Sequence, residues 1–147
     1  MTGWLLDTNI LSGLRRPKPE PKVVEFIAGQ PLDLLFISMV TLAEIRFGIE
    51  RVDDALRRAA LNDWLTHQVR PMFEGRVLPV SEAVMLRWRL LVEDGRKMNH
   101  TFSQRDLIIA ATALDHGLTL VSRDTGDFSK TAVVVFNPWA DRLPHPS

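Results

Sequence analysis

The sequence predicts an α/β fold in which a central, mostly parallel sheet carries helices on both faces. Two observations point to this class. Short apolar runs of strand length alternate along the chain with longer segments whose apolar residues recur at helical spacing. The short runs are apolar at nearly every position, which is typical of strands buried on both faces. The expected architecture is therefore a three-layer sandwich of helices, sheet and helices.

The N-terminal part of the chain predicts strand, helix, helix and strand in that order. Trp4-Leu5-Leu6 forms a short apolar run, and the residues after it are apolar at helical spacing. Three prolines end that helix and form a stiff connection, namely Pro17, Pro19 and Pro21. A second helix is expected to end near Gly29, and residues 34–37 predict the second buried strand.

The middle of the chain predicts two helices that pack as a hairpin. Residues 41–50 carry apolar side chains at helical offsets, and Gly48 marks a point of close packing or of weakness. Asp53 is expected to begin a longer amphipathic helix. The residues expected to share its apolar face are Leu56, Ala60, Trp64 and Leu65.

The C-terminal half continues the alternation of helices and strands. Residues 77–80 predict a short strand or connector, and Ser81 is placed as the N-cap of the next helix. The apolar face of that helix is expected to contain Val84, Trp88, Leu91 and Val92. Residues 107–114 are almost wholly apolar, which suits a helix enclosed by the sheet, and Gly117 stands where such a helix ends. The last strands are predicted at residues 118–121 and 133–136.

Length and composition indicate one compact domain. The chain has 147 residues, of which 46% are hydrophobic, and no linker-like stretch divides it. We expect a single domain over residues 1–140 and a short C-terminal tail over residues 141–147. Cysteine is absent, which excludes disulfides, thiolate metal sites and cysteine nucleophiles. The sequence contains neither a signal peptide nor an apolar stretch of membrane-spanning length, so a cytoplasmic location is expected.

The charge balance limits how the protein can contact nucleic acid. Eighteen basic residues match eighteen acidic ones, so the formal net charge is zero. Proteins that bind nucleic acid tightly on their own usually carry a basic excess. Any such contact is therefore expected to be local, and the basic groups available include Arg15, Arg16, Lys18, Lys22, Arg57 and Arg58.

Acidic residues recur at the ends of the predicted strands or the starts of the predicted helices. These residues are Asp7, Glu44, Asp106 and the pair Asp124 and Asp127. In a parallel sheet these positions meet at one edge, where ligands bind. Carboxylates held close together repel one another unless a cation or a proton neutralises them, and oxygen-only ligand sets favour Mg²⁺ or Mn²⁺. The pattern predicts metal-dependent cleavage of a phosphodiester.

Each of these acids also has a purely structural explanation. Thr41-Leu42-Ala43-Glu44 matches a capping box, and Ser103-Gln104-Arg105-Asp106 resembles one with aspartate in the last position. Asp7 suits a plain N-cap, and Asp124 and Asp127 are common turn residues. The functional interpretation rests on the convergence of the whole set at one edge.

Five ordered blocks of the sequence resemble the PIN-domain ribonucleases, specifically the VapC and FitB-like toxins of type II toxin–antitoxin systems. The blocks are Leu6-Asp7-Thr8-Asn9-Ile10-Leu11-Ser12, Thr41-Leu42-Ala43-Glu44-Ile45, Asp106-Leu107-Ile108-Ile109-Ala110-Ala111-Thr112-Ala113, Leu120-Val121-Ser122-Arg123-Asp124 with Asp127-Phe128, and Asn137-Pro138-Trp139. The likeness covers nearly the whole chain. It implies a PIN-like three-layer sandwich and a metal-dependent endoribonuclease.

The resemblance also implies roles for individual residues. Asp7, Glu44 and Asp106 correspond to acidic active-site residues of the family, with Asp7 and Asp106 as the usual metal ligands. Asp124 is the favoured fourth carboxylate, and Asp127 is then an acid that supports the site or the fold. The expected cofactor is Mg²⁺, for which Mn²⁺ can substitute. Three further residues are candidates to donate hydrogen bonds to phosphate or to the ligand oxygens, namely Thr8, Asn9 and Ser122.

The partners expected from the resemblance are an RNA substrate and a small cognate antitoxin. The antitoxin would silence the enzyme, and the pair would bind promoter DNA through the antitoxin. A homodimer and a toxin–antitoxin hetero-oligomer are expected, and no membrane partner.

Two other functions are compatible with parts of the pattern. A phosphohydrolase would use Asp7 as a nucleophile, although Asn9 stands where such phosphatases normally carry a second acid. A non-catalytic PIN-like module would bind RNA or protein without cutting, although all four acidic positions are retained.

Overall fold

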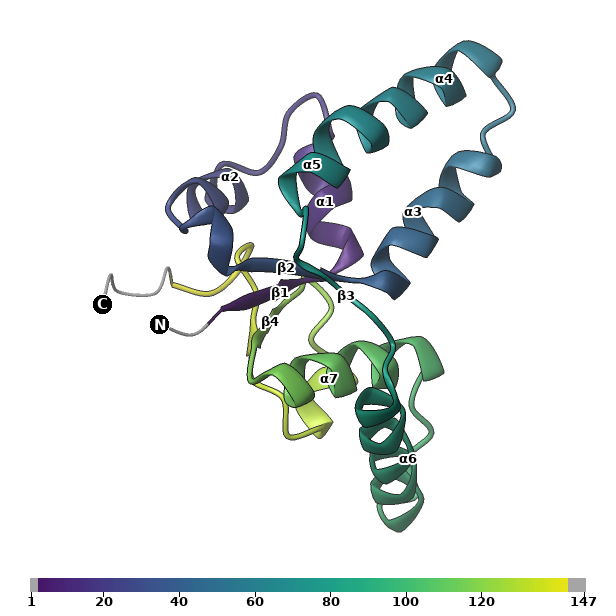
Figure 1. Ribbon diagram of the computed structural model, residues 1–147. Helices are drawn as coiled ribbons and strands as arrows, with labels where there is room; N and C mark the ends of the chain where they lie inside the picture. Colours follow the sequence, from purple (N-terminus) through teal and green to yellow (C-terminus); the bar gives the residue numbers. More distant parts are fainter. Residues whose placement is uncertain (1–2, 143–147) are drawn as a thin grey trace.

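The computed structural model describes residues 3–142, which form a five-stranded sheet with helices on both faces (Figure 1). The predicted fold class is confirmed. The predicted tail lies mostly outside the described residues. Within residues 3–142, no helix is long and apolar enough to cross a membrane. In chain order the elements are β1 (Trp4–Leu6), α1 (Thr8–Leu14), α2 (Pro21–Ala28), η1 (Leu32–Leu34), β2 (Leu35–Ser38), α3 (Met39–Glu50), α4 (Ala55–Trp64), η2 (Leu65–Val69), α5 (Arg70–Met72), β3 (Val77–Leu78), α6 (Glu82–Lys97), α7 (Gln104–His116), β4 (Thr119–Val121), η3 (Phe128–Lys130) and β5 (Val135–Phe136).

The sheet is parallel throughout, in the order β3-β2-β1-β4-β5. β1 lies at its centre, and Leu6 pairs in register with Val121 of β4. The backbone N–H of Asp7 extends this ladder by donating to the carbonyl oxygen of Val121 over 2.9 Å. Asp7 and Ser122 therefore follow neighbouring strands at the same level, on the edge where parallel α/β sheets bind ligands.

Alternate residues of the central strands enter two separate apolar cores. Leu6 and Val121 pack with α1, α2, α3 and α4 on one face. Leu5 and Leu120 pack with α6, α7 and η3 on the other. Figure 1 shows the two groups of helices on opposite sides of the sheet. Because both strand faces are buried, successive residues of β1 and β4 must be apolar, as the sequence pattern indicated.

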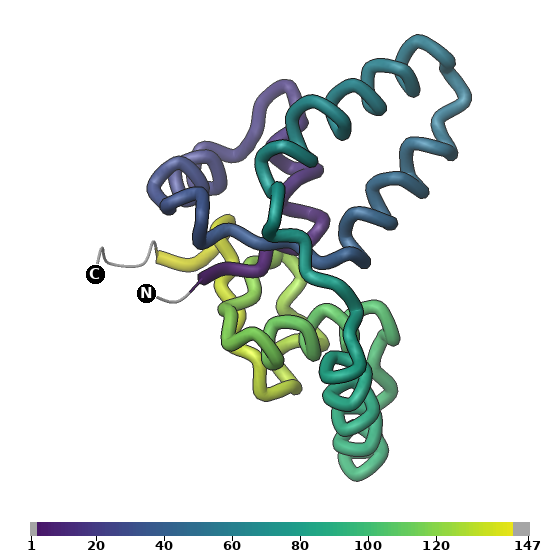
Figure 2. Tube along the Cα trace, viewed as in Figure 1, coloured from purple at the N-terminus to yellow at the C-terminus, as the bar shows by residue number. Residues whose placement is uncertain are grey.

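The predicted helical hairpin is present as α3 and α4, but the predicted first residue of the second helix and part of its predicted apolar face were wrong. Figure 2 shows α3 running outward from the sheet and α4 returning toward it after the loop that joins them. Leu56 is 85% exposed, and the buried face of the second helix contains Leu61 instead. A Cβ atom on Gly48 would meet nothing within 4 Å, so this glycine is not a point of close packing. The N-cap of α4 is Asp54 rather than Asp53.

On the other face, α6 and α7 form the densest contact between helices. Ser81 caps α6 as predicted, accepting a hydrogen bond from the backbone N–H of Val84. Gly95 of α6 lies against Phe102, whose ring would be 2.9 Å from a Cβ atom at that glycine. Gly117 ends α7 in the left-handed conformation (φ +64°), as its position predicted. This packing fixes the start of α7, which carries Asp106.

Candidate active site

Three carboxylates from three separate elements meet at the carboxyl edge of the sheet. Asp7 follows β1 and is 1% exposed. Glu44 lies in α3, which follows β2, and Asp106 lies in the first turn of α7. Because β1 and β2 are parallel neighbours, the segments that follow them begin at the same edge. The structure therefore brings together the three acids that the sequence analysis singled out first.

The guanidinium of Arg105 lies at the centre of these carboxylates. Its Nε and Nη2 donate to the two oxygens of Glu44, each over 2.9 Å. Its Nη1 donates to Asp106 Oδ1 over 2.9 Å, and both terminal nitrogens contact Asp7. One positive charge thus holds three negative ones. The sequence pattern did not indicate a role for this residue, whose one distinguishing feature is its position beside Asp106 in a predicted first helical turn.

The pKa shifts of this cluster follow from burial and charge. Burial alone would lower the pKa of Arg105, but its hydrogen bonds to Glu44 and Asp7 outweigh this effect and raise that pKa above its usual value. Burial raises the pKa of the Asp106 carboxyl. The hydrogen bond from Arg105 opposes this rise, while the negative charges of Asp124 and Asp7 add to it. The cluster therefore stabilises a cation at its centre.

Hydroxyl groups orient the carboxylates. Ser122 Oγ donates to Asp7 Oδ2 over 2.8 Å, and Thr8 Oγ1 donates to Glu44 Oε1 over 2.7 Å. Asp7 also accepts a hydrogen bond from the backbone N–H of Thr8 over 2.7 Å, so it caps α1. Two of the three predicted hydrogen-bond donors are therefore engaged with acidic oxygens of the site.

Asn9, the third predicted donor, links the site to the loop after β4. Its Nδ2 donates to Ser122 Oγ over 3.2 Å, and its Oδ1 accepts from the backbone N–H of Arg123 over 3.2 Å. Asn9 thus reaches Asp7 only through Ser122. Its side chain holds the end of β4 against the start of α1.

The capping-box explanation does not account for Glu44 or Asp106. The N-cap of α3 is Ser38, whose hydroxyl accepts from the backbone N–H of Val40, so Thr41 already lies inside the helix. Ser103 does cap α7, but its own backbone N–H donates to Asp127 and not to Asp106. Neither carboxylate completes a box.

Asp124 and Asp127 have different surroundings. Asp124 lies at the exposed rim of the site, where its Oδ1 accepts from the backbone N–H of Gly126 over 3.2 Å. It is close enough to raise the pKa of Asp106. Asp127 instead accepts from the backbone N–H of Ser103 and shares a hydrogen bond with His100, each over 3.1 Å. Asp127 therefore links two loops beside the site, whereas the negative charge of Asp124 acts on the cluster itself.

The ligands that this site can offer to a metal ion are all carboxylate oxygens. Such a donor set suits Mg²⁺ or Mn²⁺ rather than softer ions. Within residues 3–142, however, no three acidic or histidine side chains are already arranged around a common ion position. The position that an ion would share is filled by the Arg105 guanidinium. The donor chemistry thus fits a hard cation, provided that Arg105 moves.

Comparison with known proteins identifies the family. The PIN domain pattern matches residues 4–134. The toxin FitB of Neisseria gonorrhoeae is 36% identical over 137 residues, which cover 93% of this chain and 99% of FitB. A VapC ribonuclease of Sinorhizobium fredii, Y4jK, is 33% identical over 135 residues, which cover 92% of this chain and 96% of that protein.

Solved structures agree with this result. The crystal structure of FitAcB from Neisseria gonorrhoeae matches with a TM-score of 0.89 at 35% identity, over 93% of this chain and 99% of that chain. The structure of FitAB bound to an IR36 DNA fragment matches with a TM-score of 0.90 at 33% identity, over 97% of this chain and 99% of that chain. The resemblance seen in the five sequence blocks is confirmed. The chain belongs to the PIN-domain family, within the group of toxin–antitoxin toxins that includes FitB and VapC.

Proposed function

We propose that the protein is an Mg²⁺- or Mn²⁺-dependent endoribonuclease and the toxin of a type II toxin–antitoxin pair. The observation that carries this proposal is the convergence of Asp7, Glu44 and Asp106 on a single positive charge. Several relatives are named ribonucleases, among them VapC ribonuclease Y4jK. A cluster of this kind at a sheet edge suits the binding of a cation that serves phosphate chemistry.

In this proposal Asp7 and Asp106 hold the metal ion. When bound, the ion supplies polarisation of the scissile phosphate and favours ionisation of the attacking water. Glu44 and Asp124 would orient that water or a second ion. Ser122 and Thr8 would keep the Asp7 and Glu44 carboxylates in place through the hydrogen bonds that they donate. Asn9 would act on Asp7 through Ser122.

Arg105 has to leave the centre of the cluster before an ion can bind there. Its side chain is 30% exposed, so it has a path toward solvent. Outside the cluster the guanidinium would stay at the mouth of the site, where it can contact an RNA phosphate. We therefore propose that Arg105 neutralises the carboxylates in the metal-free protein and contacts substrate in the loaded one.

The test is cleavage of end-labelled single-stranded RNA by the purified protein with Mn²⁺ or Mg²⁺. We expect cutting that stops with EDTA and falls at least 100-fold in Asp7→Asn, because the ion loses a ligand. Asp33→Asn, on the exposed η1 turn, is the matched control and should cut normally. Equal cutting by wild type and Asp7→Asn, or cutting that persists in EDTA, would refute the proposal.

An antitoxin partner is the second part of the proposed function. The matching solved structures include a toxin–antitoxin complex from Klebsiella pneumoniae and FitAB bound to a DNA fragment. In this chain, Phe47 is 63% exposed and lines an open hollow of about 490 Å³ that Glu44 also borders. A partner seated there would cover apolar surface and reach the acidic site. Contact with promoter DNA would then occur through the antitoxin.

The partner proposal has its own test. The small protein encoded beside this chain should bind it and abolish RNA cleavage when both are purified. Phe47→Asp should weaken that inhibition at least tenfold, because a charge would be buried against the partner. Leu86→Asp, at an exposed apolar residue of α6, is the matched control. Equal inhibition of all three proteins would place the contact elsewhere. The oligomeric state, proposed as a homodimer and a toxin–antitoxin hetero-oligomer, can be measured by light scattering on the same samples.

The alternatives predict different results in these assays. A phosphohydrolase would release phosphate from a small phosphomonoester, and a non-catalytic module would bind RNA without cutting it. Asn9 holds Ser122 and the backbone of Arg123 through its amide, and it is not the second acid that such a phosphatase normally uses. Because the proposed substrate is cellular RNA, we propose that the protein acts in the cytoplasm.

A further inference from the structure

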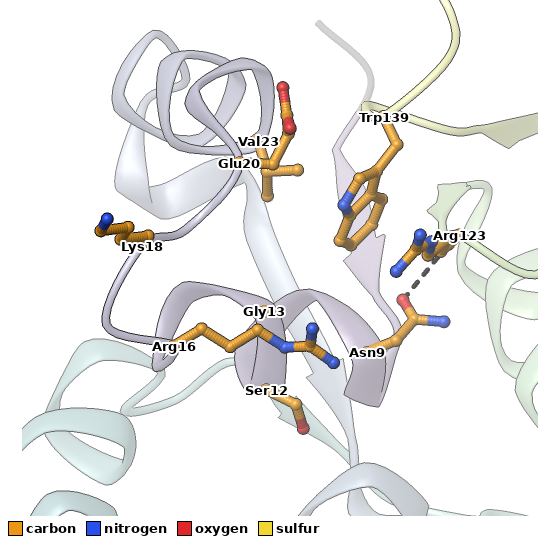
Figure 3. A pocket seen from close by; sticks show the side chains of 9 residues that line it. All are labelled: Asn9, Ser12, Gly13, Arg16, Lys18, Glu20, Val23, Arg123 and Trp139. Atoms are coloured by element: carbon orange, nitrogen blue, oxygen red, sulfur yellow. Dashed lines mark hydrogen bonds between the residues drawn. The ribbon is translucent and has the colours of Figure 1, made fainter.

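A second pocket lies beside the acidic cluster and differs from it in charge. Its volume is about 290 Å³, and Figure 3 shows it between α1, the loop that follows α1, and the loops that follow β4 and β5. This is near the lower end of the roughly 300–1,000 Å³ range of small-ligand sites. The polar and aromatic side chains that line it include Asn9, Arg16, Lys18, Glu20, Arg123 and Trp139.

The pocket concentrates positive charge in a chain that is neutral overall. Arg16, Lys18 and Arg123 line it together with one acid, Glu20. Within residues 3–142, no carboxylate forms a salt bridge with any of the three basic residues. In Figure 3 the carboxylate of Glu20 points away from the guanidinium of Arg16. Unpaired cations around one hollow favour an anion as its ligand.

Several contacts hold Arg123 and Trp139 in place in the wall of the pocket. The guanidinium of Arg123 lies over the Trp139 ring, 5.3 Å from its centroid. Trp139 packs on α1 at Gly13, where a Cβ atom would be only 3.1 Å from the indole, so the glycine permits the contact. Asn137 donates from Nδ2 to the carbonyl oxygen of Arg123 over 3.4 Å and accepts from the backbone N–H of Trp139 over 2.9 Å. The loop after β5 thus fixes Arg123 in the wall.

Asn9 connects this pocket to the acidic cluster. It lines the pocket and donates to Ser122, which in turn donates to Asp7. Two hydrogen bonds therefore separate the pocket wall from a proposed metal ligand. An anion in the pocket and a phosphate at the acidic cluster would be neighbours on one polymer strand. A ligand that could reach both places at once must carry several phosphates along one chain, as a polyanion does.

We propose that this pocket is a subsite for an RNA phosphate next to the bond that is cut. Arg16 and Lys18 bind the phosphate from the loop side, and Arg123 binds it from the side of Trp139. The inference rests on the proposed function and deepens it, because it assigns the local basic contact that a neutral chain needs to hold RNA. It also explains why a site made of carboxylates can retain a polyanion.

The test compares two double variants that remove the same charge. Arg16→Ala with Lys18→Ala removes two pocket cations, and Arg89→Ala with Arg96→Ala removes two exposed cations of α6 on the opposite face. We expect KM for single-stranded RNA to rise at least tenfold in the pocket variant, with a smaller change in kcat. The salt dependence of log KM should also lose about 0.7 for each phosphate contact removed. The α6 variant should match wild type in both respects.

Binding without cleavage separates this proposal from the proposed function. Fluorescence anisotropy of labelled RNA, with Ca²⁺ in place of Mg²⁺, should show weaker binding by the pocket variant alone. If the wild type binds RNA in this way but never cuts it, the proposed function fails and the pocket stands. If the wild type cuts RNA and the pocket variant has unchanged KM and unchanged binding, the pocket proposal fails. Inorganic phosphate can also be added to the cleavage assay. If it inhibits wild type but not the pocket variant, and both bind RNA equally, the pocket binds a free anion and the proposal fails.

Discussion

At the scale of the residue, Arg105 decides the state of the acidic cluster. Asp7 is almost fully buried, and its charge is tolerated because a guanidinium contacts it together with Glu44 and Asp106. A buried carboxylate without such a partner is costly. The same guanidinium competes with any cation for the carboxylates. In the proposed function, Arg105 would therefore stabilise the metal-free fold and weaken metal binding at the same time.

Arg105→Gln should separate these two effects. We expect Mn²⁺ to bind at least tenfold more tightly. The repulsion between two unit charges about 4 Å apart near a protein surface is about 4 kcal/mol, and removing only a third of it raises the affinity about tenfold. Without metal, the free energy of unfolding should fall by about 2 kcal/mol, since Asp7 loses its partner. Isothermal titration and urea denaturation in EDTA measure the two quantities.

Two controls support the interpretation of that experiment. Arg105→Lys keeps the charge but loses the planar fork, so its metal affinity should lie between the other two proteins. Arg89→Gln changes an exposed arginine and should leave both quantities unchanged. Unchanged or weaker Mn²⁺ binding by a folded Arg105→Gln protein would show that the guanidinium does not occupy the ion position.

At the scale of the element, the start of α7 is held by a carboxylate outside the cluster. The backbone N–H of Ser103 donates to Asp127, which lowers the pKa of that carboxyl, although burial opposes the shift and His100 adds to it. A group whose pKa is lower in the folded state contributes stability above its unfolded pKa of about 3.9 and loses it as the pH falls through the folded pKa. Asp127 thus ties the position of Asp106 to a deprotonated side chain.

Asp127→Asn should make this contribution visible. At pH 7 we expect the free energy of unfolding of the variant to be lower than that of wild type by about 1 kcal/mol. The amide oxygen can still accept the hydrogen bond from Ser103, but it lacks the negative charge that strengthens it. The difference should shrink as the pH falls below about 4, because the wild-type carboxyl becomes protonated. Urea denaturation of both proteins from pH 7 to pH 3 measures it. A difference that grows as the pH falls below about 4 would contradict the assignment.

Two of the glycines inside helices, Gly95 of α6 and Gly48 of α3, provide a matched pair of element-scale predictions. Gly95→Ala should destabilise the protein by about 1–3 kcal/mol, because the added Cβ would lie 2.9 Å from the Phe102 ring and 3.0 Å from the His100 carbonyl oxygen. Gly48→Ala should stabilise it by about 0.5–1 kcal/mol, since nothing lies within 4 Å and alanine favours the helix. Thermal melts compare them directly, and the reverse order of stability would contradict this packing.

At the scale of the whole molecule, the layers were predictable and the contacts between them were not. Uninterrupted apolar strands such as Leu5-Leu6 require burial on both faces, and this local rule gave the parallel three-layer fold. The gathering of Asp7, Glu44 and Asp106 at one edge follows from the same rule. The tertiary position of Leu56 and the reach of the Arg105 side chain depend on neighbours that are distant in sequence. Pattern reasoning along the chain therefore misplaced the first and missed the second.

The grouping of basic residues in the pocket could not be predicted from the sequence either. Arg16 and Lys18 were visible as local basic residues, but Arg123 lies more than a hundred positions further along the chain. Only the sheet, which sets β4 beside β1, brings the loop after β4 to α1. A neutral sequence thus folds into an acidic cluster with a basic pocket beside it, an arrangement suited to holding a polyanion while a cation is bound nearby.

The most direct test of the central claim is a crystal structure of the protein soaked in Mn²⁺, with the anomalous signal of manganese recorded. We predict a manganese peak within bonding distance of Asp7 and Asp106, with the Arg105 guanidinium moved out of the cluster toward solvent. An Asp7→Asn crystal treated identically should lack the peak. A wild-type crystal at saturating Mn²⁺ that still has Arg105 among the three carboxylates, with no manganese there, would contradict the account.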